Sequence, residues 1–146
     1  MSDKVLRKTH KKIGVGIIYN EREEILIDRR LAKGEMGGLW EFPGGKIESN
    51  ETVEECIKRE IKEELDIEIL VKESLLHIEH QYPKFKVSLF VHKCQYIRGI
   101  PKTIECEEIC WVQPSELDKY VFPDANYEII KFLQSFQEHG QAARTK

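Results

Sequence analysis

The chain has 146 residues, of which 40% are hydrophobic and 34% are charged. This length and composition predict one globular domain spanning 1–146 and exclude an intrinsically disordered chain. The formal net charge of −3 argues against a general nucleic-acid binder, which is usually basic. It does not exclude a phosphate substrate, because a bound metal ion can supply the missing positive charge.

The N-terminal segment 1–12 is polar and basic with no apolar run behind it, so we expect no signal peptide. No apolar stretch approaches the roughly 18 residues that a membrane span needs. The four cysteines of a chain without a secretory signal favour reduced, structural thiols and a cytoplasmic location. Cys106 and Cys110 have no second Cys or His pair nearby, which argues against a zinc site.

Alternating apolar residues predict a hairpin of two strands, followed by a glycine-rich loop. An extended piece and a turn at Gly44-Gly45 come next, and then the strongest helix of the chain, which begins with the capping-box pair Thr52 and Glu55. Further strands, a helical turn and an amphipathic helix complete an α/β domain with a mixed sheet. The expected elements are strands at 13–19, 25–27, 76–82, 85–91 and 109–112, an extended piece at 40–43, helices at 52–65 and 124–138, a helical turn at 114–117 and a disordered tail at 139–146.

The helix expected at 52–65 carries carboxylates at the edge of its apolar stripe. A step of about 100° per residue places Glu60 and Glu64 beside Ile57 and away from the solvated face. Clustered carboxylates must either take up protons or be matched by a cation, and ligands that offer only oxygen suit Mg²⁺ or Mn²⁺. An ordinary salt-bridged helix surface explains the same charges, and periodicity alone does not choose between the two explanations.

Segment 45–67 resembles the Nudix box, whose pattern is G-x₅-E-x₇-R-E-U-x-E-E-x-G-U with U an aliphatic residue. One position departs, because Asp66 stands where the pattern has glycine. That glycine ends the helix in a left-handed turn, which Asp tolerates moderately well, so we expect a small loss of stability and retained activity. Further stretches resemble the MutT branch of the Nudix hydrolases, so that the resemblance covers 12–133.

The resemblance implies a Nudix fold, in which a mixed β-sheet is sandwiched between helices, and it implies a role for individual residues. The implied catalytic residues are Arg59, Glu60, Glu63 and Glu64. The implied metal ligands are the Gly44 carbonyl, Glu60, Glu63, Glu64 and Glu105, with Glu107 and Glu108 as rivals of Glu105. The implied substrate contacts are Arg30, Glu41, Phe42, Pro43, Gly44, Tyr82 and Asn126. Arg59 is expected to orient the helix carboxylates together with Glu51.

Several of these substrate contacts have an alternative explanation. Asn126 can donate and accept hydrogen bonds at once, which suits the edge of a base, but it can equally cap the start of a helix. Phe42 and Tyr82 can line a base pocket or simply pack in the core. Phe85 departs from the MutT pattern, which has a basic residue there.

The activity implied by the resemblance is Mg²⁺-dependent hydrolysis of 8-oxo-dGTP to a nucleoside monophosphate and pyrophosphate, with Mn²⁺ as a substitute. Water would attack the β phosphorus, and Glu60 would accept its proton. One alternative is another substrate, such as a pyrimidine triphosphate or a nucleoside diphosphate derivative. Another is a nucleotide-binding Nudix module without turnover. We expect a small nucleotide as partner, no stable binding to nucleic acid or membrane, and a monomer or homodimer.

Overall fold

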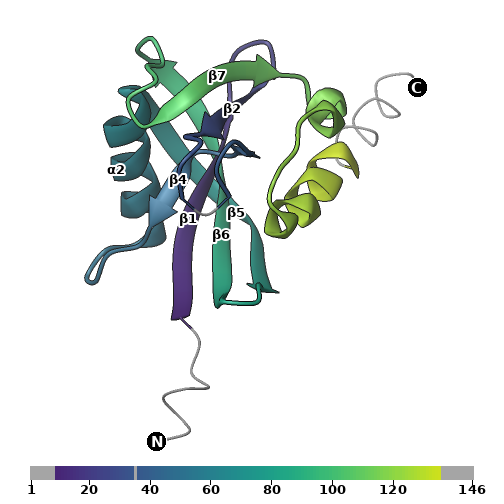
Figure 1. Cartoon of the computed structure of the whole chain (residues 1–146). Coiled ribbons are helices and arrows are strands. Elements are labelled where there is room, and N and C mark those ends of the chain that lie inside the picture. Colours follow the sequence, from purple (N-terminus) through teal and green to yellow (C-terminus); the bar gives the residue numbers. More distant parts are fainter. Residues whose placement is uncertain (1–8, 35, 136–146) are drawn as a thin grey trace, which may run out of the picture.

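A mixed sheet forms the centre of the molecule in the computed structural model, which describes residues 9–34 and 36–135 (Figure 1). The strand order is β3-β2-β1-β6-β5, with β4 paired to β1 and β7 paired to β2. β1 runs parallel to β6, whereas the other strand pairs are antiparallel. The strands are β1 (Thr9–Tyr19), β2 (Ile25–Arg30), β3 (Trp40–Glu41), β4 (Gly44–Lys46), β5 (Glu68–Gln81), β6 (Phe85–Arg98) and β7 (Cys106–Val112).

Helix α2 (Val53–Leu65) has the termini that its sequence predicts. The Thr52 hydroxyl accepts from the Glu55 N–H, and the Glu55 carboxylate accepts from the Thr52 N–H, a cap that stabilises a helix by about 1 kcal/mol. At the other end Asp66 takes the left-handed conformation, with φ 56° and ψ 41°. The expectation that Asp replaces the glycine of the pattern in this conformation is therefore confirmed.

The sheet separates two hydrophobic cores, as the α/β sandwich predicts. On one face α2 buries Ile57, Ile61 and Leu65 against the sheet. On the other face lie the 3-10 helices η1 (Pro114–Lys119) and η2 (Asp124–Asn126) and a final helix over 127–135. Figure 1 shows α2 and this last helix on opposite sides of the sheet.

Two glycines of β1 bring α2 close to the sheet. A Cβ on Gly14 would lie 3.0 Å from Ile57 Cγ1, and one on Gly16 would lie 2.9 Å from Ile61 Cδ1. Both separations are shorter than ordinary van der Waals contact. The helix therefore rests directly on the backbone of β1.

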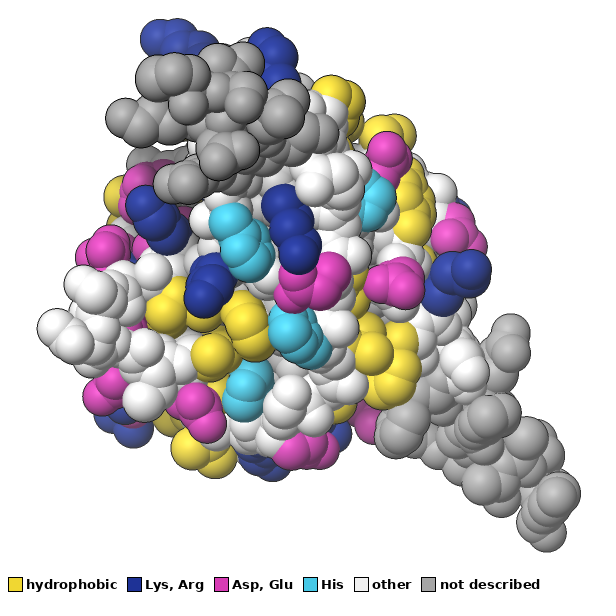
Figure 2. All heavy atoms as spheres, turned by 90° about the horizontal axis from the view of Figure 1, so that it is seen from below, with side chains coloured by type: hydrophobic (Ala, Val, Ile, Leu, Met, Phe, Trp, Pro, Cys, Tyr) yellow, Lys and Arg dark blue, Asp and Glu magenta, His cyan; other side chains and the backbone are white. Residues whose placement is uncertain are grey.

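Three neighbouring strands are tied together by polar side chains near the start of β1. His10 Nε2 lies 2.6 Å from Ser88 Oγ, which donates to Glu79 Oε2 at 2.6 Å, and Lys86 Nζ lies 3.0 Å from Glu79 Oε1. Figure 2 views the molecule from this end and shows histidine, basic and acidic side chains next to one another. These contacts hold the first residues of β1 in register with β6 and β5.

The structure corrects several expectations about the elements, and β1, β2 and β7 are each at least three residues longer than the strands expected. Gly44-Gly45 is not a turn but belongs to β4, because a strand can approach β1 closely where it lacks side chains. β5 and β6 are longer than expected, since the bulges between them break the alternation of their sequences. The helix expected at 124–138 starts as η2 and is helical over 127–135, whereas 136–138 and the tail at 139–146 lie outside the described residues.

The four cysteines are free thiols, three of them buried. Cys56 lies on the buried side of α2, as expected, and its Sγ donates to the Gly45 carbonyl at 3.3 Å. Burial raises the pKa of the Cys56 thiol to about 11, which keeps it protonated at neutral pH. Within the described part of the chain, no helix is long and apolar enough to cross a membrane.

Candidate active site

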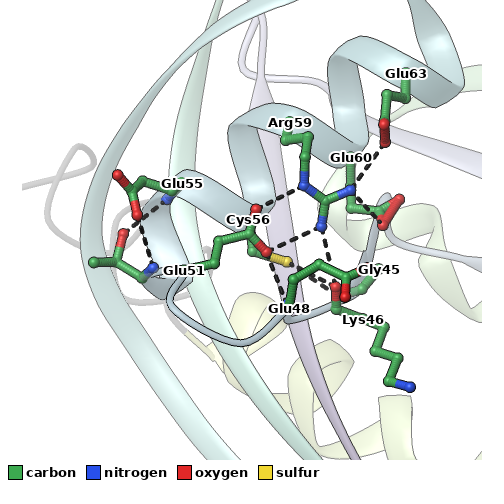
Figure 3. Close-up of polar contacts among 10 residues, drawn as sticks. Gly45, Lys46, Glu48, Glu51, Glu55, Cys56, Arg59, Glu60 and Glu63 are labelled. Carbon is green, nitrogen blue, oxygen red and sulfur yellow. Dashed lines mark hydrogen bonds and ion pairs between the residues drawn. The ribbon is translucent and has the colours of Figure 1, made fainter.

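Arg59 joins α2 to the segment before it (Figure 3). Its Nε donates to Glu51 Oε2 at 2.6 Å, and its Nη2 donates to the Lys46 carbonyl at 3.2 Å. Its Nη1 donates to Glu60 Oε2 at 3.2 Å and to Glu63 Oε1 at 2.9 Å. The hydrogen bond from Arg59 lowers the pKa of Glu51 to about 2. Arg59, held by Glu51, therefore contacts the carboxylates of Glu60 and Glu63, as the resemblance to the Nudix box implies.

The glycines of β4 allow a carboxylate of α2 to touch the strand backbone. A Cβ on Gly45 would lie 2.3 Å from the carboxyl carbon of Glu60, and one on Gly44 would lie 2.0 Å from the Gly14 carbonyl oxygen. No other residue fits at either position without movement of the strand or of the carboxylate. The Nudix-box pattern therefore brings the β4 backbone and Glu60 to one place.

Glu60 and Glu64 form a close carboxyl pair one turn apart on α2. Each carboxyl group lies close enough to the other to affect its pKa. Burial raises the pKa of both groups, and for Glu64 burial and the nearby Glu41, Glu60 and Glu105 carboxylates raise it to about 9. The helical-wheel placement of Glu60 and Glu64 at the edge of the apolar stripe is confirmed.

The structure adds Asp28 of β2, which sequence reasoning missed. The residue is only 2% exposed, and it lies opposite Glu41 in the antiparallel pairing of β2 with β3. Burial, followed by the charges of Glu41 and Glu64, raises the pKa of Asp28 to about 10. The available signal was an acid directly after three apolar strand residues, Ile25 to Ile27.

The three acidic residues that compete for the loop position are placed differently. Glu105 is close enough to Glu64 to raise the pKa of that residue. Glu107 and Glu108 both lie 3.3 Å from Arg29 Nη2, and Glu107 also accepts from the Ala32 N–H. The structure therefore favours Glu105 over its two rivals.

A cavity of about 170 Å³ opens on the sheet face away from α2. Five of the seven expected substrate contacts lie in its wall, namely Arg30, Glu41, Phe42, Tyr82 and Asn126. Pro43 and Gly44 are not among its lining residues, and the buried Pro43 uses its carbonyl to accept from the Gly16 N–H at 2.8 Å. The complete lining is Lys11, Ile13, Val15, Arg30, Met36, Glu41, Phe42, Tyr82, Phe85, Val87, Leu89, Pro123, Ala125 and Asn126.

The aromatic residues of the cavity both pack in the core and line the open space. Phe42 is 4% exposed and stacks on Phe122 with 5.0 Å between ring centroids. The Tyr82 hydroxyl accepts from the Ala125 N–H at 2.9 Å, which ties the residue directly after β5 to η2. The two explanations offered for these side chains are therefore compatible.

Asn126 ends η2 and lines the cavity, directly before the final helix. Its Nδ2 donates to the Pro123 carbonyl at 3.5 Å, a long hydrogen bond. Nearby, Arg30 Nη1 lies 2.8 Å from Glu41 Oε1, so the cavity also holds a paired cation and anion.

Sequence reasoning missed Lys11 and Phe85 as parts of this wall. Lys11 Nζ lies 4.0 Å from the centroid of the Phe85 ring, a separation typical of cation–π contact. The alternation of Lys11, Ile13 and Val15 along β1 was the signal that could have found Lys11.

Comparison with known proteins agrees with this geometry. The family model described as NUDIX domain matches residues 14–132. The chain belongs to the Nudix family. It is 35% identical to an 8-oxo-dGTP diphosphatase of Haemophilus influenzae over 84% of this chain and 90% of the relative. It is 28% identical to a CTP pyrophosphohydrolase of Escherichia coli over 84% and 91% of the two chains.

The Nudix fold is confirmed by solved structures as well. The crystal structure of a MutT protein from Methanosarcina mazei superimposes with a TM-score of 0.78, covering 92% of this chain and 98% of that one at 24% identity. The protein is accordingly an α/β enzyme of the Nudix hydrolase class, which acts on small nucleotides.

Nudix hydrolases generally need a divalent metal, and the donor atoms of this site fit one. The carboxylates of Glu60 and Glu64 and the backbone of Gly44 and Gly45 offer oxygen, which hard divalent cations prefer. Within residues 9–34 and 36–135, no three His, Cys, Asp or Glu side chains already stand at metal-ligand spacing. A cation would instead offset the burial and the repulsion that now raise the pKa of Glu64.

Proposed function

We propose that this Nudix hydrolase converts 8-oxo-dGTP to the nucleoside monophosphate and pyrophosphate in a Mg²⁺-dependent reaction. The observation that carries the proposal is the position of Glu41. This residue lines the cavity, and its charge adds to burial in raising the pKa of Glu64 and of Asp28. A nucleotide whose base fills the cavity therefore places its phosphates beside the carboxylate cluster.

The proposed metal ligands are the Gly44 carbonyl, Glu60, Glu63, Glu64 and Glu105. Bound Mg²⁺ would neutralise phosphate oxygens and acidify a coordinated water. Glu60 accepts the proton of the attacking water, and burial suits it to this task by making it a stronger base than an exposed glutamate. Arg59 fixes the direction of Glu60 and Glu63 through its two hydrogen bonds.

The proposed nucleotide contacts divide between phosphates and base. Arg30, next to Glu41, contacts the phosphates as a positive charge. Phe42 and Tyr82 pack against the faces and edges of the base, whereas the Asn126 amide donates to and accepts from its polar edge. Pro43 and Gly44 remain proposed contacts through their backbone.

A substrate panel tests the proposal. We expect kcat/KM for 8-oxo-dGTP to exceed that for dGTP by at least tenfold, the equivalent of about 1.4 kcal/mol. A ratio near one would exclude the proposed role in removing oxidised nucleotides. Phosphate analysis after incubation with Mg²⁺ separates an enzyme from a binding module, because the latter releases no product.

A pyrimidine triphosphate is the second candidate substrate, favoured by the similarity to the CTP pyrophosphohydrolase. CTP and dCTP therefore belong in the same panel, and a higher kcat/KM for either than for 8-oxo-dGTP would support this alternative. We further propose a monomer or homodimer that acts on the cytoplasmic nucleotide pool and binds no nucleic acid stably. Light scattering of the pure protein measures the first property, and gel-shift titration measures the last.

A further inference from the structure

Lys11 is a charged residue of the cavity wall that the proposed function leaves unused. Because side chains of a strand alternate between faces, Lys11, Ile13 and Val15 form one row along β1, and all three line the cavity. The side chain of Lys11 is half-buried, and its ammonium lies 4.0 Å from the centroid of Phe85 on the neighbouring strand β6. The contact with the aromatic ring restrains the ammonium at the cavity wall.

The position of Lys11 along β1 separates it from the phosphate end of the site. Val15 pairs with Gly44 of β4, which lies beside the carboxylate cluster. Lys11 is four residues earlier, and at about 3.3 Å per residue this is roughly 13 Å further along the wall. At that end the ring of Phe85 lies 5.0 Å from the ring of Tyr82. Lys11 therefore belongs to the part of the cavity that receives the base.

Polar contacts at the start of β1 fix the backbone at Lys11 to the neighbouring strands. His10 bonds to Ser88 of β6, and Ser88 bonds to Glu79 of β5. In addition, Lys11 and Val87 are direct partners in the parallel pairing of β1 with β6. The backbone beneath Lys11 is thus fixed to β6, which carries Phe85, and to β5, which Tyr82 directly follows.

An ammonium group has three hydrogen-bond donors and no acceptor. It therefore interacts favourably with a carbonyl oxygen of a base and unfavourably with an amino group at the same place. We propose that Lys11 is a specificity-determining residue that donates to a carbonyl oxygen of the nucleobase and so favours oxopurine over aminopurine nucleotides. This inference rests on the proposed function, since it concerns the same cavity and its substrate.

Lys11→Met tests the inference, with Lys12→Met as the matched control. Lys12 is the next residue of β1, is exposed, and has its side chain on the opposite face of the sheet. For Lys11→Met we expect kcat/KM for 8-oxo-dGTP and dGTP to fall by about 10- to 100-fold, mostly through KM, because a hydrogen bond from a charged group is lost. The kcat/KM for dATP should change less than about twofold, and Lys12→Met should match the parent protein on all three substrates.

Lys11→Arg provides a second variant, which keeps the positive charge and the donors. We expect it to retain most of the preference for dGTP over dATP, which a purely steric effect of Met would not predict. An equal loss on all three nucleotides in Lys11→Met would overturn the inference, because it would place Lys11 on the triphosphate. Unchanged kinetics would overturn it as well.

The test of Lys11 can fail or succeed independently of the test of the proposed substrate. A ratio near one for 8-oxo-dGTP over dGTP in the parent protein would reject the proposed substrate, while the comparison of dGTP with dATP would still test Lys11. Calorimetric binding of dGMP and dAMP to the same variants makes that comparison without turnover. There, an unchanged preference for dGMP in Lys11→Met would contradict the inference, and a reduced preference would support it.

Discussion

The carboxylate site and the nucleotide cavity adjoin at Glu41, but the chain assembles them differently. The carboxylate site comes mainly from one segment, β4 through α2, whose parts are fixed by Arg59 and by a capped helix. The cavity wall comes from positions as far apart as Lys11 and Asn126. The residues proposed for the chemical step are therefore mostly close in sequence, whereas those proposed for substrate choice are distant residues that the sheet brings together. Variants should therefore separate into two kinetic classes.

Glu64→Gln should impair the chemical step and have the largest effect of the variants. Replacing one charged oxygen ligand in the cluster should lower kcat by roughly 10²- to 10³-fold, as removal of other electrostatic contacts to a transition state does. Steady-state kinetics at saturating Mg²⁺ measures this loss. Glu54→Gln is the matched control, because Glu54 is exposed in the first turn of the same helix. Hydrolysis by Glu64→Gln at the parent rate would exclude Glu64 from the site.

Asp28→Asn should show that the buried carboxyl group of Asp28 lowers the free energy of unfolding at neutral pH. The pKa of Asp28 is raised to about 10 from 3.8, so the unfolded chain releases this proton at lower pH than the folded protein does. The parent protein therefore loses stability as pH rises from about 4 towards 10, and a neutral Asn avoids the loss.

Urea denaturation without added metal, at pH 4.5 and pH 8, measures this difference. We expect Asp28→Asn to raise the free energy of unfolding by about 2–3 kcal/mol at pH 8 and by little at pH 4.5. Equal effects at the two pH values would contradict the assignment of a buried, protonated Asp28.

Asn126→Ala should change the specificity side and leave the chemical step nearly intact. Loss of its amide should reduce the preference for 8-oxo-dGTP over dGTP by about 10-fold, since a site built to hydrogen-bond a polar group discriminates through that bond. The measurement is the ratio of the two kcat/KM values, with kcat as an internal control. Equal losses for both substrates would show that Asn126 only supports η2.

Asp66→Gly should have the smallest effect, and it tests whether the C-terminal end of α2 matters for stability or for activity. Glycine relieves the left-handed backbone of Asp66, but it removes ion pairs to Lys62 and Lys102, both at 2.9 Å. Because these groups are exposed, each pair is worth little, and we expect a net change below about 1 kcal/mol in thermal unfolding with unchanged kcat. A large loss of activity would mean that Asp66 also positions the catalytic helix.

Local patterns were sufficient to predict part of the molecule. The cap of α2 and the hairpin of β1 and β2 follow from residues close in sequence, whereas the left-handed end of α2 and the clamp of Arg59 on Glu51 were expected from the resemblance to the Nudix box. Burial and pairing across the sheet are not local, and they account for the rest. Asp28 was missed because its burial depends on β3 and α2, and β4 was taken for a turn because its pairing requires contact with Gly14. The distinction between Glu105 and its neighbours needed the position of Arg29.

The glycines of β1 beneath α2 have a mechanical consequence for the enzyme. The side chains of Ile57 and Ile61 fill the space that a Cβ on Gly14 or Gly16 would need. The distance between α2 and the sheet therefore determines the position of every side chain on the helix. A methyl group added at Gly14 or Gly16 would force Ile57 or Ile61 to move, and with them the helix segment that carries Glu60 and Glu64.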